Sequence, residues 1–92
     1  MGFEIKFNWA LQAEPKEKLE ENLVCDFAMH GNRAFPIDTP IDLLNFKREA
    51  VAKVRVLEYT NIKNETRGNF RVVKIYQGEE KKILTNYWLE NE

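Results

Sequence analysis

Residues 50–60 read AVAKVRVLEYT, and this stretch indicates that the second half of the chain forms β-strands. Its larger apolar residues are β-branched, aliphatic or aromatic, a mixture typical of strands; they are Val51, Val54, Val56, Leu57 and Tyr59. Residues 69–77, NFRVVKIYQ, have the same character, and residues 82–89, KILTNYWL, are predicted as a further strand. We therefore expect a three-stranded antiparallel meander, with a polar loop around Gly68 and a hairpin connection at Gly78.

The N-terminal stretch 3–11, FEIKFNWAL, alternates between apolar and mostly polar residues, which is typical of a strand with one buried face. The face predicted to be buried carries Phe3, Ile5, Phe7, Trp9 and Leu11. We expect this strand to join the meander, and the sheet could then curl into a partly closed barrel.

Residues 15–30 are predicted as one helix. Pro15 suits the first helical position, Gly31 is a typical stop, and an apolar stripe recurs every four residues at Leu19, Leu23 and Phe27. The second half of this segment also alternates, at Leu23, Cys25, Phe27 and Met29. A strand over residues 23–29 is therefore the alternative, although the helix is preferred.

The doubled motif FPIDTPID, residues 35–42, predicts a corner that opens a short helical turn over residues 40–47. Thr39 has the position of an N-cap, Pro40 that of the first helical residue, and Asp42 lies in the first turn near the positive end of the helix dipole. The predicted fold is thus a single α+β domain over residues 1–92: an N-terminal strand, one helix, a short helical turn and the meander.

The bulk composition suits a soluble protein of a reducing compartment. The chain has 92 residues, a formal net charge of −1 and a single cysteine, Cys25, which cannot form an internal disulfide. No apolar run approaches the roughly 18 residues that a membrane-spanning helix needs, and the N-terminus does not read as a signal peptide. We expect a cytoplasmic protein with no membrane partner and no cofactor.

An enzyme could be built only from His30, Asp38 and Asp42. His30 is the single histidine, and the spacing of the two aspartates is explained locally by a turn and a helix start. A zinc site takes three or four protein ligands, which His30 and Cys25 cannot supply. The sequence therefore predicts no catalytic residue, no metal site and no enzyme.

The stretch from Lys47 to Lys82 carries ten Lys/Arg and five Glu, and it supplies four of the five candidate binding residues, while the fifth follows it in the C-terminal stretch. These candidates are Arg55, Arg71, Lys74, Tyr76 and Trp88. Cations and aromatics interleaved on a sheet can bind single-stranded nucleic acid, but such domains are usually plainly basic as a whole. We therefore expect a small non-enzymatic binding or protein-interaction module. Nucleic-acid binding is the first alternative, and a small enzyme using Asp38, Asp42 and His30 is the second.

The apolar character of both faces of residues 69–77 and 82–89 predicts self-association. An antiparallel sheet with one wet face should alternate cleanly, and an exposed apolar face is rarely tolerated in a monomer. A symmetric homodimer with Tyr87 and Trp88 as contact residues is one solution, and closure of the barrel is the other.

Three short motifs resemble a family of short bacterial proteins. They are Met1, Gly2 and Asn8; the run Lys18-Leu19-Glu20-Glu21-Asn22-Leu23; and Phe35-Pro36-Ile37-Asp38 with Pro40. The family occurs in low-GC Gram-positive bacteria and is classed as a domain of unknown function. The resemblance covers residues 1 to about 76, so residues 77–92 would be an addition. It implies a bacterial cytosolic origin and assigns no functional residue.

Overall fold

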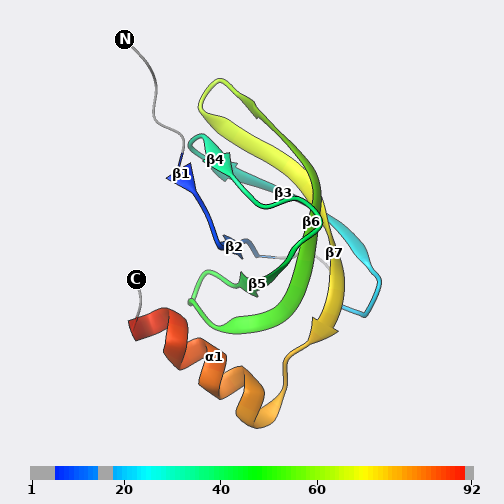
Figure 1. Ribbon diagram of the computed structural model, residues 1–92, viewed down its shortest axis with the longest axis vertical. Coiled ribbons are helices and arrows are strands. Elements are labelled where there is room, and N and C mark those ends of the chain that lie inside the picture. The colour runs from blue at the N-terminus through cyan, green and yellow to red at the C-terminus, as the bar shows by residue number, and fades with distance from the viewer. Residues whose placement is uncertain (1–5, 15–17, 91–92) are drawn as a thin grey trace.

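A curved mixed sheet with one helix at its end makes up the fold (Figure 1). The computed structural model describes residues 6–14 and 18–90. Its elements are β1 (Lys6–Phe7), β2 (Ala10–Gln12), β3 (Val24–His30), β4 (Arg33–Ala34), β5 (Pro40–Leu44), β6 (Ala50–Ile62), β7 (Glu65–Ile75) and α1 (Gly78–Glu90). Five strands form the main sheet in the order β2-β5-β6-β7-β3, and β1 pairs with β4 beside it. The pairs β1–β4 and β2–β5 are parallel, whereas the other pairs are antiparallel.

The hairpin of β6 and β7 is the centre of the sheet, and it confirms the strands predicted at 50–60 and 69–77. Its two turn residues, Lys63 and Asn64, have φ values of 53° and 61°, the left-handed pair of a type I′ turn. The predicted loop around Gly68 is wrong, because β7 already begins at Glu65 and Gly68 pairs with Tyr59. A Cβ at Gly68 would lie 2.2 Å from the carbonyl oxygen of Glu58, so only glycine fits this rung.

Two irregularities bend this hairpin around the core. The pairing of β6 with β7 shifts register between Lys53 and Val54 and again between Val56 and Glu58. Alternate residues up to Val56 point into the core, and beyond the second shift it is Tyr59 that packs against it. Bulges of this kind bend a strand and increase its twist. The sheet therefore curves strongly (Figure 1), without closing into a barrel.

The predicted helix over 15–30 is wrong, and the alternative strand is correct. Residues Val24–His30 form β3, in which Cys25 and Phe27 are buried while their neighbours face outward. The strand forms in place of the helix because β7 provides a backbone partner for each of its seven residues. Gly31 does adopt a left-handed conformation, with φ at 93°, but it ends a strand. The expected helix start at Pro15 lies outside the described residues.

The helical turn predicted over 40–47 is also wrong. Residues Pro40–Leu44 form β5, whose Ile41 and Leu43 are buried against the core. Pro40 takes the first position of the strand, where the missing N–H is tolerated. Phe46, in the turn that follows, is 69% exposed.

Residues 82–89 form most of helix α1, so the third strand of the predicted meander does not exist. Leu84 and Trp88, four positions apart, pack against a small cluster of Leu44, Ala50 and Tyr76. Glu79 and Glu80 lie in the first turn, where carboxylates favour a helix through its dipole. The predicted antiparallel meander with a preceding helix is thus replaced by a mixed sheet followed by a helix.

The predicted N-terminal strand is interrupted within its described residues, and it joins the main sheet in parallel. From residue 6 onward, Lys6–Phe7 and Ala10–Gln12 are strands, and β2 pairs with β5. Leu11 is fully buried as expected, but Trp9 is 65% exposed because the segment breaks between the two short strands. Phe3 and Ile5 lie outside the described residues. The main core instead centres on Phe27, Phe35 and Phe70, with ring centroids of Phe27 and Phe35 5.7 Å apart.

Candidate functional site

Four cations gather on the outer face of the central hairpin, the face turned away from the main core. Lys53 and Arg55 alternate along β6 with fully buried alanine and valine side chains. Arg71 and Lys74 occupy β7, and both are exposed. We call these four residues the cationic face. It brings together the three predicted cations and adds Lys53, which the sequence analysis did not select even though it lies two residues before Arg55 on the same strand.

Like charges lie directly opposite one another on this face. Arg55 pairs with Arg71 across the ladder, and Lys53 pairs with Lys74. Directly opposed side chains of a sheet have Cβ atoms only about 4.5–5.5 Å apart, so like charges there are destabilising. The two pairs therefore reduce the stability of the hairpin.

Neighbouring carboxylates offset only part of this repulsion. The Arg55 guanidinium lies 3.7 Å from the Asp38 carboxylate and donates to the Asp38 carbonyl at 2.5 Å, and Lys74 lies 2.9 Å from a Glu80 oxygen. Within residues 6–14 and 18–90, neither Lys53 nor Arg71 forms an ion pair.

The two predicted aromatic residues lie elsewhere and share one partner. The hydroxyl of Tyr76 donates to one oxygen of the Asp42 carboxylate at 2.6 Å, and the indole Nε1 of Trp88 donates to the other at 2.7 Å. Burial, reinforced by the hydrogen bond to Asp42, raises the pKa of Tyr76 well above its usual range. We call these three side chains the Asp42 clamp; it joins β5 to the end of β7 and to α1. Asp42 is thus part of a helix-docking contact and not the helix cap that the sequence predicted.

Two further contacts reinforce the docking of α1. The backbone N–H of Ala50 donates to the Thr85 hydroxyl at 3.0 Å. The guanidinium of Arg48 donates to the carbonyl of Trp88 at 3.3 Å. Since no residue of α1 is fully buried, these few polar contacts and the Leu84–Trp88 stripe hold the helix in place.

The three residues of the enzyme alternative are not brought together. Asp42 lies opposite Lys53 of β6, whereas His30 lies opposite Glu65, which in turn pairs with Ile62 of β6. Lys53 and Ile62 are nine positions apart on that strand. The part of the chain that the structure describes contains no group of three or more His, Cys, Asp or Glu side chains that could hold a metal ion.

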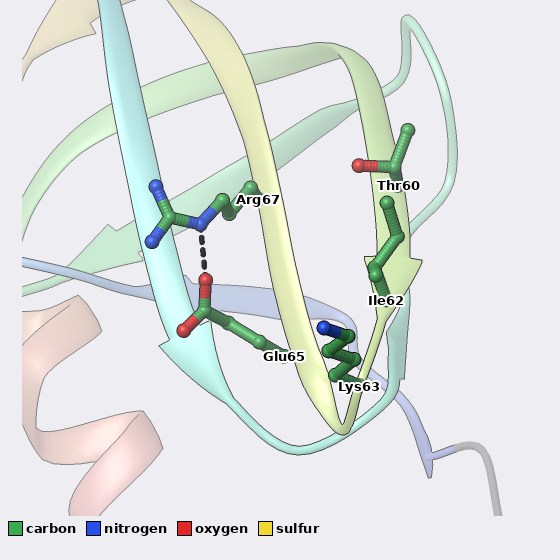
Figure 2. A pocket seen from close by; sticks show the side chains of 5 residues that line it. All are labelled: Thr60, Ile62, Lys63, Glu65 and Arg67. Carbon is green, nitrogen blue, oxygen red and sulfur yellow. Dashed lines mark hydrogen bonds and ion pairs between the residues drawn. The ribbon is translucent and has the colours of Figure 1, made fainter.

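Two open hollows mark the surface. One, of about 220 Å³, lies at the tip of the hairpin, where Figure 2 shows the ion pair between Glu65 and Arg67 beside Lys63. The other is a groove of about 790 Å³ with a mixed lining of carboxylates, amides and apolar groups. It is lined by Ala13, Glu14, Cys25, Asp26, Phe27, Ala28, Phe46, Glu58, Tyr59, Thr60, Arg67, Gly68 and Asn69. The first hollow carries the cations Lys63 and Arg67, and the groove carries the carboxylates Glu14, Asp26 and Glu58.

No helix among the described residues is long and apolar enough to cross a membrane, since α1 has only 13 residues.

Comparison with known proteins shows a shared fold. No family model matches the chain, and a search of curated proteins finds no match. A crystal structure of the protein ytmB from Bacillus subtilis is similar, with a TM-score of 0.69 and 22% sequence identity over 83% of this chain and 95% of that one. The curved mixed sheet is therefore an arrangement that a bacterial protein also adopts.

Proposed function

We propose that this chain is a small non-enzymatic interaction module that binds an acidic protein segment through its cationic face. The observation that carries the proposal is the pair of like-charged rungs, Arg55 with Arg71 and Lys53 with Lys74. A sheet gains stability by replacing one member of such a pair with a neutral residue. Keeping both pairs is explained if an anionic partner neutralises them on binding.

The placement of the aromatic residues favours a protein partner over single-stranded nucleic acid. Stacking of bases requires exposed aromatic rings beside the cations. Here Phe70 is 1% and Tyr76 3% exposed, and Tyr59 packs its ring against Phe35 at a centroid distance of 5.7 Å. Arg71 is instead flanked by an aliphatic side chain, since Val24 pairs with it and is 51% exposed.

We propose that the module belongs to a bacterial cytoplasm. The single cysteine is buried and forms no disulfide, which suits a reducing cytoplasm. The fold shared with a Bacillus protein supports the predicted relationship to small proteins of low-GC Gram-positive bacteria.

Fluorescence anisotropy with two labelled probes of equal charge tests the proposal. One probe is a ten-residue glutamate peptide, and the other is a single-stranded thymidine oligonucleotide with ten phosphates. We expect the peptide to bind at low salt and Arg71→Gln to weaken binding by roughly 1.5- to 5-fold, the range for an exposed ion pair. Lys63→Gln removes the same charge at the hairpin tip and serves as the matched control.

Stability provides an independent readout of the same substitution. Arg71→Gln relieves the repulsion from Arg55 and should raise the free energy of unfolding by about 0.2–1 kcal/mol. Peptide binding that is absent, or that responds equally to Lys63→Gln, would contradict the proposal. Tighter binding of the oligonucleotide, surviving physiological salt, would replace the acidic peptide by nucleic acid as the partner.

A further inference from the structure

We infer that β3 is the docking edge for a second copy of this chain, paired antiparallel about a two-fold axis at Phe27. The main sheet ends in two edge strands, β2 and β3. A free edge presents unpaired N–H and C=O groups that can hydrogen-bond a further strand. The two edges of this sheet differ in how well they are protected against such pairing.

The β2 edge is short, whereas the β3 edge is long and carries one outward-facing carboxylate, Asp26. β2 has only three residues. β3 has seven residues, pairs with β7 in unbroken register from Val24 to His30, and contains no proline, lysine or bulge. Proline, lysine and bulges are the usual devices by which sheet edges avoid pairing. In the described part of the chain, no strand pairs with the other side of β3.

The surface around β3 is also open. The larger groove is lined by four consecutive residues of this strand, from Cys25 to Ala28. The outward-facing Val24 is 51% exposed, so pairing with another strand would remove apolar area from water. The edge therefore offers both backbone partners and an apolar contact.

The charges along β3 are compatible with antiparallel pairing of two copies. With Phe27 on the axis, the antiparallel register places Val24 opposite His30 and Asp26 opposite Ala28 of the other copy. No like charges are directly opposed, and the small Ala28 leaves room beside each Asp26. The two Asp26 carboxylates are diagonal neighbours across the axis, and diagonal neighbours are farther apart than directly opposed residues. On β7, Asp26 pairs with Asn69, so Arg67 and Arg71 flank each carboxylate diagonally.

This surface differs from the contact residues that the sequence predicted, Tyr87 and Trp88. Trp88 donates to Asp42 and packs against the small cluster under α1, so its indole is already engaged. The β3 edge adjoins the cationic face, since Val24 pairs with Arg71, but the four residues of that face lie on β6 and β7 and not on β3 itself.

Sedimentation equilibrium of the full chain from 10 µM to 1 mM, with two opposite substitutions at Ala28, tests the inference. Seven residues a side is well below the roughly 20–30 of a standard interface, so we expect a weak dimer. Ala28→Lys places an ammonium opposite Asp26 twice in each dimer and should tighten association roughly two- to thirtyfold. Ala28→Asp places a carboxylate there and should weaken it by a similar factor.

Thr60 provides the matched control. It lies on the same rung two strands away, because Ala28 pairs with Arg67 and Arg67 with Thr60, and it is exposed. Thr60→Lys and Thr60→Asp should leave the dimer unchanged, and circular dichroism confirms that each variant is folded. A monomer at 1 mM for both the unmodified chain and Ala28→Lys would overturn the inference. So would a dimer that ignores both Ala28 substitutions but dissociates with Tyr87→Ser, since that result assigns the contact to α1.

Discussion

Replacing Asp42 by alanine should release helix α1 from the sheet. The Asp42 carboxylate accepts from the Tyr76 hydroxyl at 2.6 Å and from the Trp88 indole at 2.7 Å, one donor for each oxygen. A hydrogen bond to a charged group contributes about 1.5–3 kcal/mol, and a donor left buried without a partner adds a desolvation cost. Because the clamp is only partly buried, we expect Asp42→Ala to cost about 2–4 kcal/mol. Asp42→Asn keeps one acceptor and should cost about half as much.

The loss of stability caused by Asp42→Ala should be concentrated in α1. The helix has 13 residues, none of them fully buried, and an isolated helix of this length is marginal in water. Once the clamp is gone, the backbone amides of residues 78–90 should exchange with deuterium faster, while those of β6 keep their protection. Urea unfolding followed by circular dichroism gives the accompanying free energy.

Two comparison variants separate the clamp from the helix cap predicted by the sequence. Tyr76→Phe removes one donor to Asp42. Because the two residues are coupled, the loss in free energy of unfolding caused by Tyr76→Phe should be about 1–2 kcal/mol smaller when Asp42 is already alanine than in the unmodified chain. Thr39→Ala should cost less than about 0.5 kcal/mol, because the Thr39 hydroxyl only donates to the exposed carbonyl of Ile37, whereas a lost cap costs about 1 kcal/mol. Additive effects of Asp42→Ala and Tyr76→Phe, or unchanged exchange in α1, would refute this account.

Three further substitutions or conditions test the hairpin and the clamp. Gly68→Ala should cost at least about 1–3 kcal/mol in urea unfolding, because its Cβ would meet a backbone oxygen at 2.2 Å, and an unchanged midpoint would contradict the close approach of β6. Lys63→Gly should raise the free energy of unfolding by roughly 0.5–1 kcal/mol, since glycine adopts a φ of 53° without strain; a loss in thermal denaturation would argue against the type I′ turn. The raised pKa of Tyr76 means that its neutral form is favoured in the folded state, so this contribution to stability is complete below pH 10 and is lost as the pH rises above it. A pH series of urea unfolding should show that decline in the unmodified chain and a smaller one in Tyr76→Phe; equal declines would exclude Tyr76 as the cause.

The sequence by itself determined the two central strands. In residues 50–60 and 69–77 most of the larger apolar residues are β-branched or aromatic, and the structure buries Val54, Val56, Phe70 and Val72 almost completely. The sequence also places Arg55, Arg71 and Lys74 on these strands, so a cationic surface could be predicted from it. Strand type and outward-facing charge are local properties, because they depend on which residues recur every second position.

Tertiary structure decided the segments whose local pattern fits two periods. Residues 23–29 alternate but also continue a four-residue stripe, and pairing with β7 selects the strand. Residues 82–89 are apolar on both sides of a strand, yet they form a helix because Leu84 and Trp88 meet the cluster around Tyr76. In each case the partner lies far away in the chain, so no window of sequence contains the deciding contact.

The role of Asp42 shows the same limit at a single residue. Its spacing from Thr39 is that of a helix cap, but its two donors lie 34 and 46 positions later. Local spacing describes which conformations a segment can adopt, whereas the choice among them depends on hydrogen bonds and buried area supplied by distant segments. That dependence is why a carboxylate that reads as a local turn residue becomes the contact that holds the C-terminal helix.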